Sequence, residues 1–233
     1  MVCSLSENLA EVQRRIAKAC ERVGRHSDEV KLVAVSKTHP AQAVREAIAV
    51  GCTVFGENKV QEAGDKIAEI GRNAAEWHLI GHLQSNKARK AVQLFDVIHS
   101  LDSVELAERL ERVCKEENRS ELKVFAQVDL AGEETKSGVA EDHLAAMVEF
   151  LQKCERLKFS GLMILPPYFD DPEAARPFFI RLREIRDRLA SQGAFATADG
   201  ELSMGMSHDF EVAIEEGATI VRVGTAIFGK RNR

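Results

Sequence analysis

The chain has 233 residues, of which 45% are hydrophobic and 30% are charged, and its net charge at pH 7 is −5. This composition supplies enough apolar side chains for a core, and the charge argues against a nucleic-acid surface or a polybasic membrane patch. The N-terminal stretch has no signal-peptide pattern, and no apolar run approaches the roughly 18 residues that a membrane helix needs.

The chain begins with a predicted amphipathic helix over residues 6–24. Eight short runs rich in β-branched and apolar residues follow, as expected for parallel strands that are covered on both faces. These runs are residues 31–37, 53–57, 77–81, 96–101, 123–130, 159–165, 201–205 and 219–224. Helix-period segments lie between them at residues 41–50, 104–118, 141–157, 173–190 and 208–216.

Proline and glycine positions support these helix limits. Pro40 stands at the start of the first intervening helix and Gly51 at its end. Helices commonly have proline in the first turn and glycine just after the last one. For the last helix, Ser207 is the candidate N-cap and Gly217 the candidate C-terminal glycine. Residues 166–200 contain clustered Pro, Asp and Gly, which predict a long loop on each side of a helix.

The alternation of strands and helices predicts an α/β protein with a parallel sheet. Eight units in about 200 residues favour a closed (β/α)8 TIM barrel over an open doubly wound sheet. We therefore expect one domain over residues 1–233, with an extra N-terminal helix and no second β domain. The five cysteines include no CxxC pair and are typical of a reduced, cytoplasmic protein.

Polar residues follow the predicted strands at the end where such barrels carry their active sites. Lys37 ends the first strand, Glu57 and Asn58 end the second, and Asp129 ends the fifth before the motif EETKSG. The third strand is followed by His82, Gln84, Ser85 and Asn86, and the last two strands are followed by the motifs MGMSHD and RVGTAIFG.

The last two motifs each place a glycine near a hydroxyl residue, Gly205 with Ser207 and Gly224 with Thr225. Glycine lets a phosphate approach backbone N–H groups, and barrels of this class often bind phosphate between the loops after strands seven and eight. The alternative is that these glycines only make tight turns between strand and helix.

Two cationic side chains are expected at the barrel mouth. Arg222 shares a strand face with Gly224, and a buried arginine needs either a ligand or an inward carboxylate. Lys37 shares a face with Val33 and Val35, and partial desolvation there would lower the pKa of its ammonium and favour the free amine. A free amine can form a Schiff base with an aldehyde. A phosphorylated aldehyde such as pyridoxal phosphate would therefore fit.

The motifs AVSKTHP, FGENKVQEA, WHLIGHLQSNK, ETKSG and LSMGMSHDFEVAIEEGATIVRVGTAIFG together resemble those of the pyridoxal-phosphate homeostasis protein family, single-domain relatives of alanine racemase. The resemblance runs from about residue 5 to the end of the chain. It implies a barrel that holds pyridoxal 5′-phosphate, with Lys37 as the Schiff-base partner and Asn58 near the ring. It also implies phosphate contacts from Ser207, Gly224 and Thr225, and an arginine, Arg222, facing the pyridine nitrogen.

An arginine at the ring nitrogen predicts weak catalysis. Enzymes that use the ring as a strong electron sink place a carboxylate there, whereas arginine cannot hold that nitrogen protonated. A racemase also needs a second base opposite the lysine, and the only tyrosine, Tyr168, lies in the loop 166–172, to which the resemblance assigns no role. We therefore assign no catalytic residue and expect a carrier or buffer of the cofactor in intracellular homeostasis.

Two alternatives stay open: a pyridoxal-phosphate-dependent amino-acid racemase, and a barrel enzyme that uses Lys37 in another Schiff base, as aldolases do. A metal site is not expected, because His78 and His82 lack a third ligand at suitable spacing. The expected partners are the cofactor and apo-enzymes that receive it, with no nucleic acid and no membrane. Without the second domain of alanine racemase, the chain is expected to be a monomer.

Overall fold

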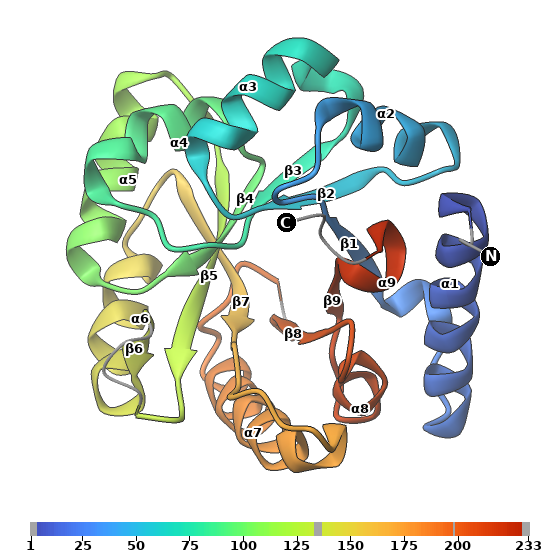
Figure 1. Cartoon of the computed structure of the whole chain (residues 1–233). Coiled ribbons are helices and arrows are strands. Elements are labelled where there is room, and N and C mark those ends of the chain that lie inside the picture. The colour runs from blue at the N-terminus through green and yellow to red at the C-terminus, as the bar shows by residue number, and fades with distance from the viewer. Residues whose placement is uncertain (1–3, 133–136, 198, 230–233) are drawn as a thin grey trace.

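Eight parallel strands surround the centre of the molecule, and helices cover them on the outside (Figure 1). The computed structural model describes residues 4–132, 137–197 and 199–229. The barrel strands are β1 (Lys31–Val35), β2 (Val54–Glu57), β3 (Glu76–Leu79), β4 (Val97–Leu101), β5 (Leu122–Asp129), β7 (Leu157–Met163), β8 (Glu201–Met206) and β9 (Ile220–Val223). A two-residue strand, β6 (Val139–Ala140), pairs with the end of β5.

The sheet closes on itself as a barrel. The strands follow one another in chain order, β4 pairs with β5, β5 with β7, and β9 returns to β1. Val33 of β1 stands beside Arg222 of β9, and Val35 stands beside Gly56 of β2. Because every pairing is parallel, the carboxyl ends of all eight barrel strands meet at one rim, where residues distant in sequence can share a site.

The helices form the outer layer of the barrel. They are α1 (Leu5–Arg22), α2 (Ala41–Ala49), α3 (Val60–Ile70), α4 (Ala88–Leu94), α5 (Val104–Glu116), α6 (Leu144–Gln152), α7 (Arg176–Ser191), α8 (Phe210–Glu215) and α9 (Thr225–Phe228). Short 3-10 turns span Ser27–Glu29, Arg72–Ala74, Ser85–Lys87, Glu141–His143 and Pro172–Ala175. The N-terminal helix α1 contacts α8 and α9 and so covers the side where the barrel closes (Figure 1). No helix of the described residues is long and apolar enough to cross a membrane.

The predicted (β/α)8 barrel with an extra N-terminal helix is confirmed. Each predicted strand corresponds to an observed one, and α7 stands between two long loops as expected for residues 166–200. Two helices, α3 and α4, were not predicted. Gly64 lies inside α3 and weakens its helical pattern, while α4 has only 7 residues, too few for a clear period.

The prediction that Ser207 is the N-cap of the helix at residues 208–216 is wrong. Helix α8 begins at Phe210 with Asp209 at its N-cap position, and Asp209 Oδ1 accepts a hydrogen bond from the Met206 N–H (2.6 Å). Gly217 does follow α8 with a φ of +95°, so the predicted glycine stop is confirmed.

Side-chain alternation along the strands divides the apolar core in two. A small cluster fills the barrel interior and consists of Val33, Val54, Val97, Phe125, Met163 and Ile220. The larger cluster lies between the strands and the helices, and it contains Val221 and Val223, as predicted from their position beside Arg222. The interior is therefore a packed core, and the carboxyl-terminal rim is where barrels of this kind bind their ligands.

Candidate functional site

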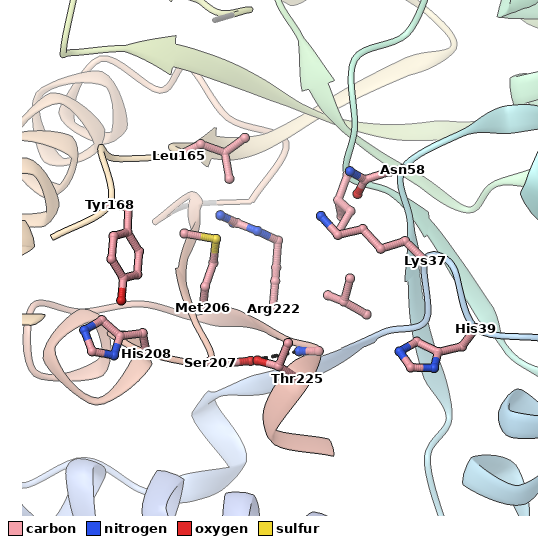
Figure 2. A pocket seen from close by; sticks show the side chains of 13 residues that line it. Lys37, His39, Asn58, Leu165, Tyr168, Met206, Ser207, His208, Arg222 and Thr225 are labelled. Carbon is pink, nitrogen blue, oxygen red and sulfur yellow. Dashed lines mark hydrogen bonds between the residues drawn. The ribbon is translucent and has the colours of Figure 1, made fainter. Parts of the chain in front are cut away.

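A cavity of about 410 Å³ opens at the carboxyl-terminal rim of the barrel (Figure 2). Its volume lies within the range of typical small-molecule sites. The residues that line it come from the ends of β1, β2, β3, β8 and β9 and from the loop after β7: Val35, Lys37, His39, Asn58, Ile80, Leu165, Tyr168, Met206, Ser207, His208, Arg222, Gly224 and Thr225.

The structure brings all six predicted cofactor-binding residues together in this cavity. They are Lys37, Asn58, Ser207, Arg222, Gly224 and Thr225. In Figure 2 the side chains of Lys37 and Arg222 extend toward the centre of the cavity, while Ser207 and Thr225 lie at its edge. The cavity thus combines an amine, a guanidinium, an amide and two hydroxyls, and their roles toward a ligand stay predictions.

Ser207 joins the loops after β8 and β9. Its Oγ accepts hydrogen bonds from the backbone N–H groups of Gly224 (3.1 Å) and Ala226 (3.4 Å). A hydroxyl has two acceptor positions and one donor, so this arrangement leaves the Ser207 O–H as the group that can donate to a ligand. Thr225 contributes a second hydroxyl next to it.

Glycine is favoured at positions 205 and 224 of these loops for different structural reasons. Gly205 has a φ of +92°, and a Cβ there would lie 2.7 Å from Ala213 Cβ, so the turn itself requires glycine. Gly205 is not among the residues that line the cavity. Gly224 does line it, and a Cβ at this position would lie 3.2 Å from the Val35 carbonyl oxygen. The tight-turn alternative therefore accounts for Gly205, and close packing of β9 on β1 contributes to the choice of Gly224.

Arg222 is a buried cation at the floor of the cavity, with 3% of its surface exposed. It donates to Ser203 Oγ through Nη1 (2.6 Å) and to the Ile164 carbonyl oxygen through Nη2 (2.8 Å). Burial lowers the pKa of the guanidinium to about 10, which leaves it charged at neutral pH. Among the described residues no carboxylate forms an ion pair with it, so the structural ion pair considered as an alternative is not observed there.

A chain of hydrogen bonds leads from Arg222 through the barrel interior. Ser203 Oγ lies 2.8 Å from His99 Nδ1, and His99 Nε2 lies 2.8 Å from His78 Nδ1. His78 Nε2 in turn lies 2.8 Å from Glu76 Oε1 at the opposite end of the barrel. These partners were missed from the sequence, where His78 was considered only as a possible metal ligand.

The two histidines considered from the sequence, His78 and His82, have different surroundings and different partners. His78 is buried in the chain just described, whereas His82 is exposed and contacts Asp102 (Nδ1 to Oδ2, 3.0 Å). In the part of the chain that the structure describes, no group of three or more His, Cys, Asp or Glu side chains could hold a metal ion. Residues 133–136 of the predicted EETKSG loop lie outside the described residues.

Tyr168 and His208 lie at the rim of the cavity. Their ring centroids are 5.5 Å apart, and His208 Nε2 lies 3.0 Å from the Asp170 carbonyl oxygen (Figure 2). Tyr168 is 75% exposed, the highest exposure among the large hydrophobic residues noted on the surface. Neither residue was predicted to reach the site. The signal that could have found His208 is its position directly after Ser207, at a strand end.

Comparison with known proteins identifies the family. The model of the alanine racemase N-terminal domain matches residues 8–232. The pyridoxal phosphate homeostasis protein of Aquifex aeolicus is 46% identical over 225 residues and is covered to 97%, as is this chain. The protein of the same name from Escherichia coli K12 is 40% identical over 238 residues, which cover 98% of this chain and 97% of that protein.

Solved structures agree with this assignment. PipY of Synechococcus elongatus, whose structure has pyridoxal phosphate bound, superposes with a TM-score of 0.85 at 41% identity, covering 97% of this chain and 100% of PipY. Alanine racemase from Corynebacterium glutamicum superposes with a TM-score of 0.68 at 20% identity and shares the barrel fold over 96% of this chain and 62% of its own. The chain therefore belongs to the pyridoxal phosphate homeostasis protein family and carries the alanine racemase N-terminal domain.

Proposed function

We propose that this protein holds pyridoxal 5′-phosphate as a Schiff base on Lys37 and acts as a carrier or buffer of the cofactor, with little or no catalysis. The observation that carries the proposal is the meeting of Lys37, Arg222, Ser207 and Thr225 in one cavity. The names of its relatives and the PipY structure with pyridoxal phosphate bound support the same ligand.

The residues of the cavity fit this cofactor. Apolar side chains (Val35, Ile80, Leu165 and Met206) provide surfaces for an aromatic ring. The hydroxyls of Ser207 and Thr225 supply donors for a phosphate. The described residues that line the cavity include no Asp or Glu, whose carboxylate would repel that phosphate. A volume of about 410 Å³ accommodates a single ring with a phosphate.

Bound pyridoxal phosphate would supply an aldehyde that reacts with amines. The Lys37 Nζ lone pair would form the carbon–nitrogen bond, and the aldehyde oxygen would leave as water after taking up the two protons of the amine. Asn58, which follows β2 beside Lys37, can donate to a polar ring substituent through its amide. Because water can hydrolyse this carbon–nitrogen bond, Lys37 can also release the aldehyde unchanged.

Arg222 would limit the reactions that follow binding. Its guanidinium stays charged at neutral pH and can donate to the ring nitrogen, but it cannot keep that nitrogen protonated. A ring without that proton withdraws electrons weakly, so proton removal from a bound amino acid would be slow. This property favours holding the cofactor over turning over amino acids.

One observation supports amino-acid racemisation as a second candidate. Tyr168 lines the same cavity as Lys37, so a phenol and an amine face one ligand site from different sides (Figure 2). A racemase needs two such groups. Incubation with single L-amino acids and an assay for D-isomers tests it: turnover near 1 per second or faster, lost in Tyr168→Phe, would favour the racemase.

We further propose that residues 1–233 form one domain that works as a monomer in the cytoplasm and passes the cofactor to apo-enzymes. The family model covers nearly all of the chain, and the four cysteines among the described residues form no disulfide. Light scattering tests the monomer. Mixing the loaded protein with an apo-enzyme and following the recovery of that enzyme's activity tests the transfer.

The central experiment is an absorbance spectrum of the purified protein before and after addition of pyridoxal phosphate. A visible Schiff-base band that is absent in Lys37→Ala is expected. Reduction with borohydride and mass spectrometry should then locate the cofactor on the Lys37 peptide. A wild-type protein that develops no band would contradict the proposal and leave an aldolase-type use of Lys37 as the candidate.

A further inference from the structure

Lys37 sits on a backbone segment that helix α3 holds from both sides. Lys66 of α3 donates a hydrogen bond through Nζ to the carbonyl oxygen of Ser36, the residue before Lys37 (2.7 Å). Glu62, one turn earlier in α3, accepts a hydrogen bond at Oε1 from the N–H of Thr38, the residue after Lys37 (2.5 Å). The same two side chains also pair with each other, Lys66 Nζ to Glu62 Oε1 (2.7 Å).

Glu57 completes this group on the outer face of the barrel. Its Oε1 accepts hydrogen bonds from Lys66 Nζ (2.7 Å) and from Ser36 Oγ (2.6 Å). The three donors of the Lys66 ammonium therefore meet three acceptors, on Ser36, Glu57 and Glu62. None of Lys66, Glu57 and Glu62 is among the residues that line the cavity, so Lys66 and Glu62 reach the site through the backbone that follows β1.

The backbone conformation of Thr38 explains why these hydrogen bonds from α3 are needed. Thr38 has a φ of +68°, which is rare for a β-branched residue and costs energy unless surrounding contacts enforce it. The hydrogen bond from the Thr38 N–H to Glu62 supplies one such contact, and it lies directly next to Lys37. The turn at Lys37 and Thr38 follows β1, and its backbone conformation sets the direction of the Lys37 side chain.

Stability alone does not account for the buried charges. Glu57 is fully buried, its Oε2 is the carboxylate oxygen without a hydrogen-bond partner in the described structure, and burial raises the pKa of this carboxyl. A buried ion pair of this kind contributes little to stability compared with well-packed apolar residues. A role in fixing the geometry of the adjacent segment fits these observations better.

We propose that Lys66 and Glu62 are positioning residues that hold the peptide groups on both sides of Lys37 and thereby aim its amine at the carbon with which it bonds. The inference rests on the proposed function, because it concerns the bond between Lys37 and the cofactor aldehyde. It predicts that bond formation depends on Lys66, whereas the contacts to the ring and the phosphate do not.

Two ligands separate these steps. Pyridoxine 5′-phosphate has the ring and phosphate of pyridoxal 5′-phosphate but an alcohol in place of the aldehyde, so it can bind without bonding to Lys37. In Lys66→Met we expect the rate of bond formation with pyridoxal phosphate to fall about tenfold or more, as measured by the absorbance band and borohydride trapping. The dissociation constant for pyridoxine 5′-phosphate should stay within about twofold of wild type.

Further variants keep the test decisive. The Lys66→Met change alone leaves the buried Glu57 carboxylate unpaired and could unfold the protein. The double variant Glu57→Gln, Lys66→Met removes that carboxylate as well. A thermal melt checks that each variant is folded. Glu62→Gln keeps an oxygen acceptor for Thr38 and should give a smaller loss than Lys66→Met. Lys153→Met is the matched control, because Lys153 forms the same i,i+4 pair with Glu149 (2.7 Å) on the exposed surface of α6.

Unchanged bond formation in both Lys66 variants would overturn the inference. A parallel loss of binding for both ligands would also overturn it, since that result indicates a general effect on the fold. These failures differ from failure of the proposed function, in which the wild-type protein itself forms no bond with pyridoxal phosphate.

Discussion

His99 Nδ1 lies 2.8 Å from Ser203 Oγ, and this contact joins Arg222 to the chain of hydrogen bonds inside the barrel. The Glu76 carboxyl is ionised, because its pKa is about 2, so its oxygen can only accept from the His78 Nε2–H. Burial lowers the pKa of His78, and the neutral ring then accepts at Nδ1. His99 therefore carries its proton on Nε2 and donates it to His78 Nδ1, and His78 donates from Nε2 to the Glu76 carboxylate. Both histidines are neutral in this arrangement.

Burial keeps His99 neutral and makes the fold sensitive to acid. Its pKa lies well below the usual 6.5, because desolvation disfavours a positive ring, and the charges of Arg222 and Lys31 add to this effect. An unfolded chain can protonate this histidine below pH 6.5 while the folded chain cannot, so stability falls as the pH drops through 6.5. In His99→Asn this loss should shrink by up to about 1.4 kcal/mol per pH unit, measured by urea unfolding at several pH values. An unchanged slope would show that His99 titrates normally.

Glu76 makes stability depend on pH in a second, more acidic range, and here the titrating group is an acid and not a base. The hydrogen bond from His78, opposed by partial burial and helped by Lys31, lowers the pKa of the Glu76 carboxyl from 4.5 to about 2. An acid with a lowered folded pKa stabilises the fold above the unfolded value, and that contribution disappears as the pH falls from 4.5 toward 2. Glu76→Gln should cost about 1 kcal/mol near pH 6, a figure reduced because Glu76 is one-third exposed. The difference from wild type should narrow below pH 4.5 in the same unfolding experiment.

Ser207 is predicted to act on the phosphate end of the ligand. Ser207→Ala removes the O–H donor and the acceptor that joins the loops after β8 and β9, and it should weaken pyridoxal phosphate binding about tenfold. Pyridoxal, which has no phosphate, should bind the variant and the wild type alike. Equal losses for both ligands in fluorescence titrations would indicate that Ser207 supports the loop and not the phosphate.

Gly205 is predicted to matter for stability and not for the ligand. Gly205→Ala places a Cβ 2.7 Å from Ala213 Cβ at a φ of +92°, and we expect a loss of about 2–3 kcal/mol in the free energy of unfolding. Gly51→Ala is the matched control: Gly51 has a φ of +101° but no atom within 4 Å of the added Cβ. It should lose about 1 kcal/mol from backbone strain alone. Equal losses in the two variants would remove the contact with Ala213 as the cause.

Local sequence pattern was enough to predict the alternation of strands and helices, and this alternation led to the barrel and to the residues at its rim. Alternation along β9 was enough to turn Arg222 inward and Val221 and Val223 outward, because a strand has a fixed side-chain period. Inspection of the strand ends found Lys37, Asn58, Ser207 and Thr225, which line one cavity. It also proposed residues that do not line it: Glu57, His82, Gln84, Ser85, Asn86 and Asp129. These features depend on local pattern and on the rule that parallel strands share one end.

The partners of those residues could not be predicted from local pattern, because they depend on the three-dimensional arrangement of the strands and helices. His99 and Ser203 are 104 residues apart in sequence, and their contact depends on the register of β4 and β8 across the closed barrel. Lys66 reaches the Ser36 carbonyl from a helix that the sequence pattern did not predict. Such contacts depend on how strands and helices are staggered in space, and a one-residue shift in register would turn each side chain to the other face.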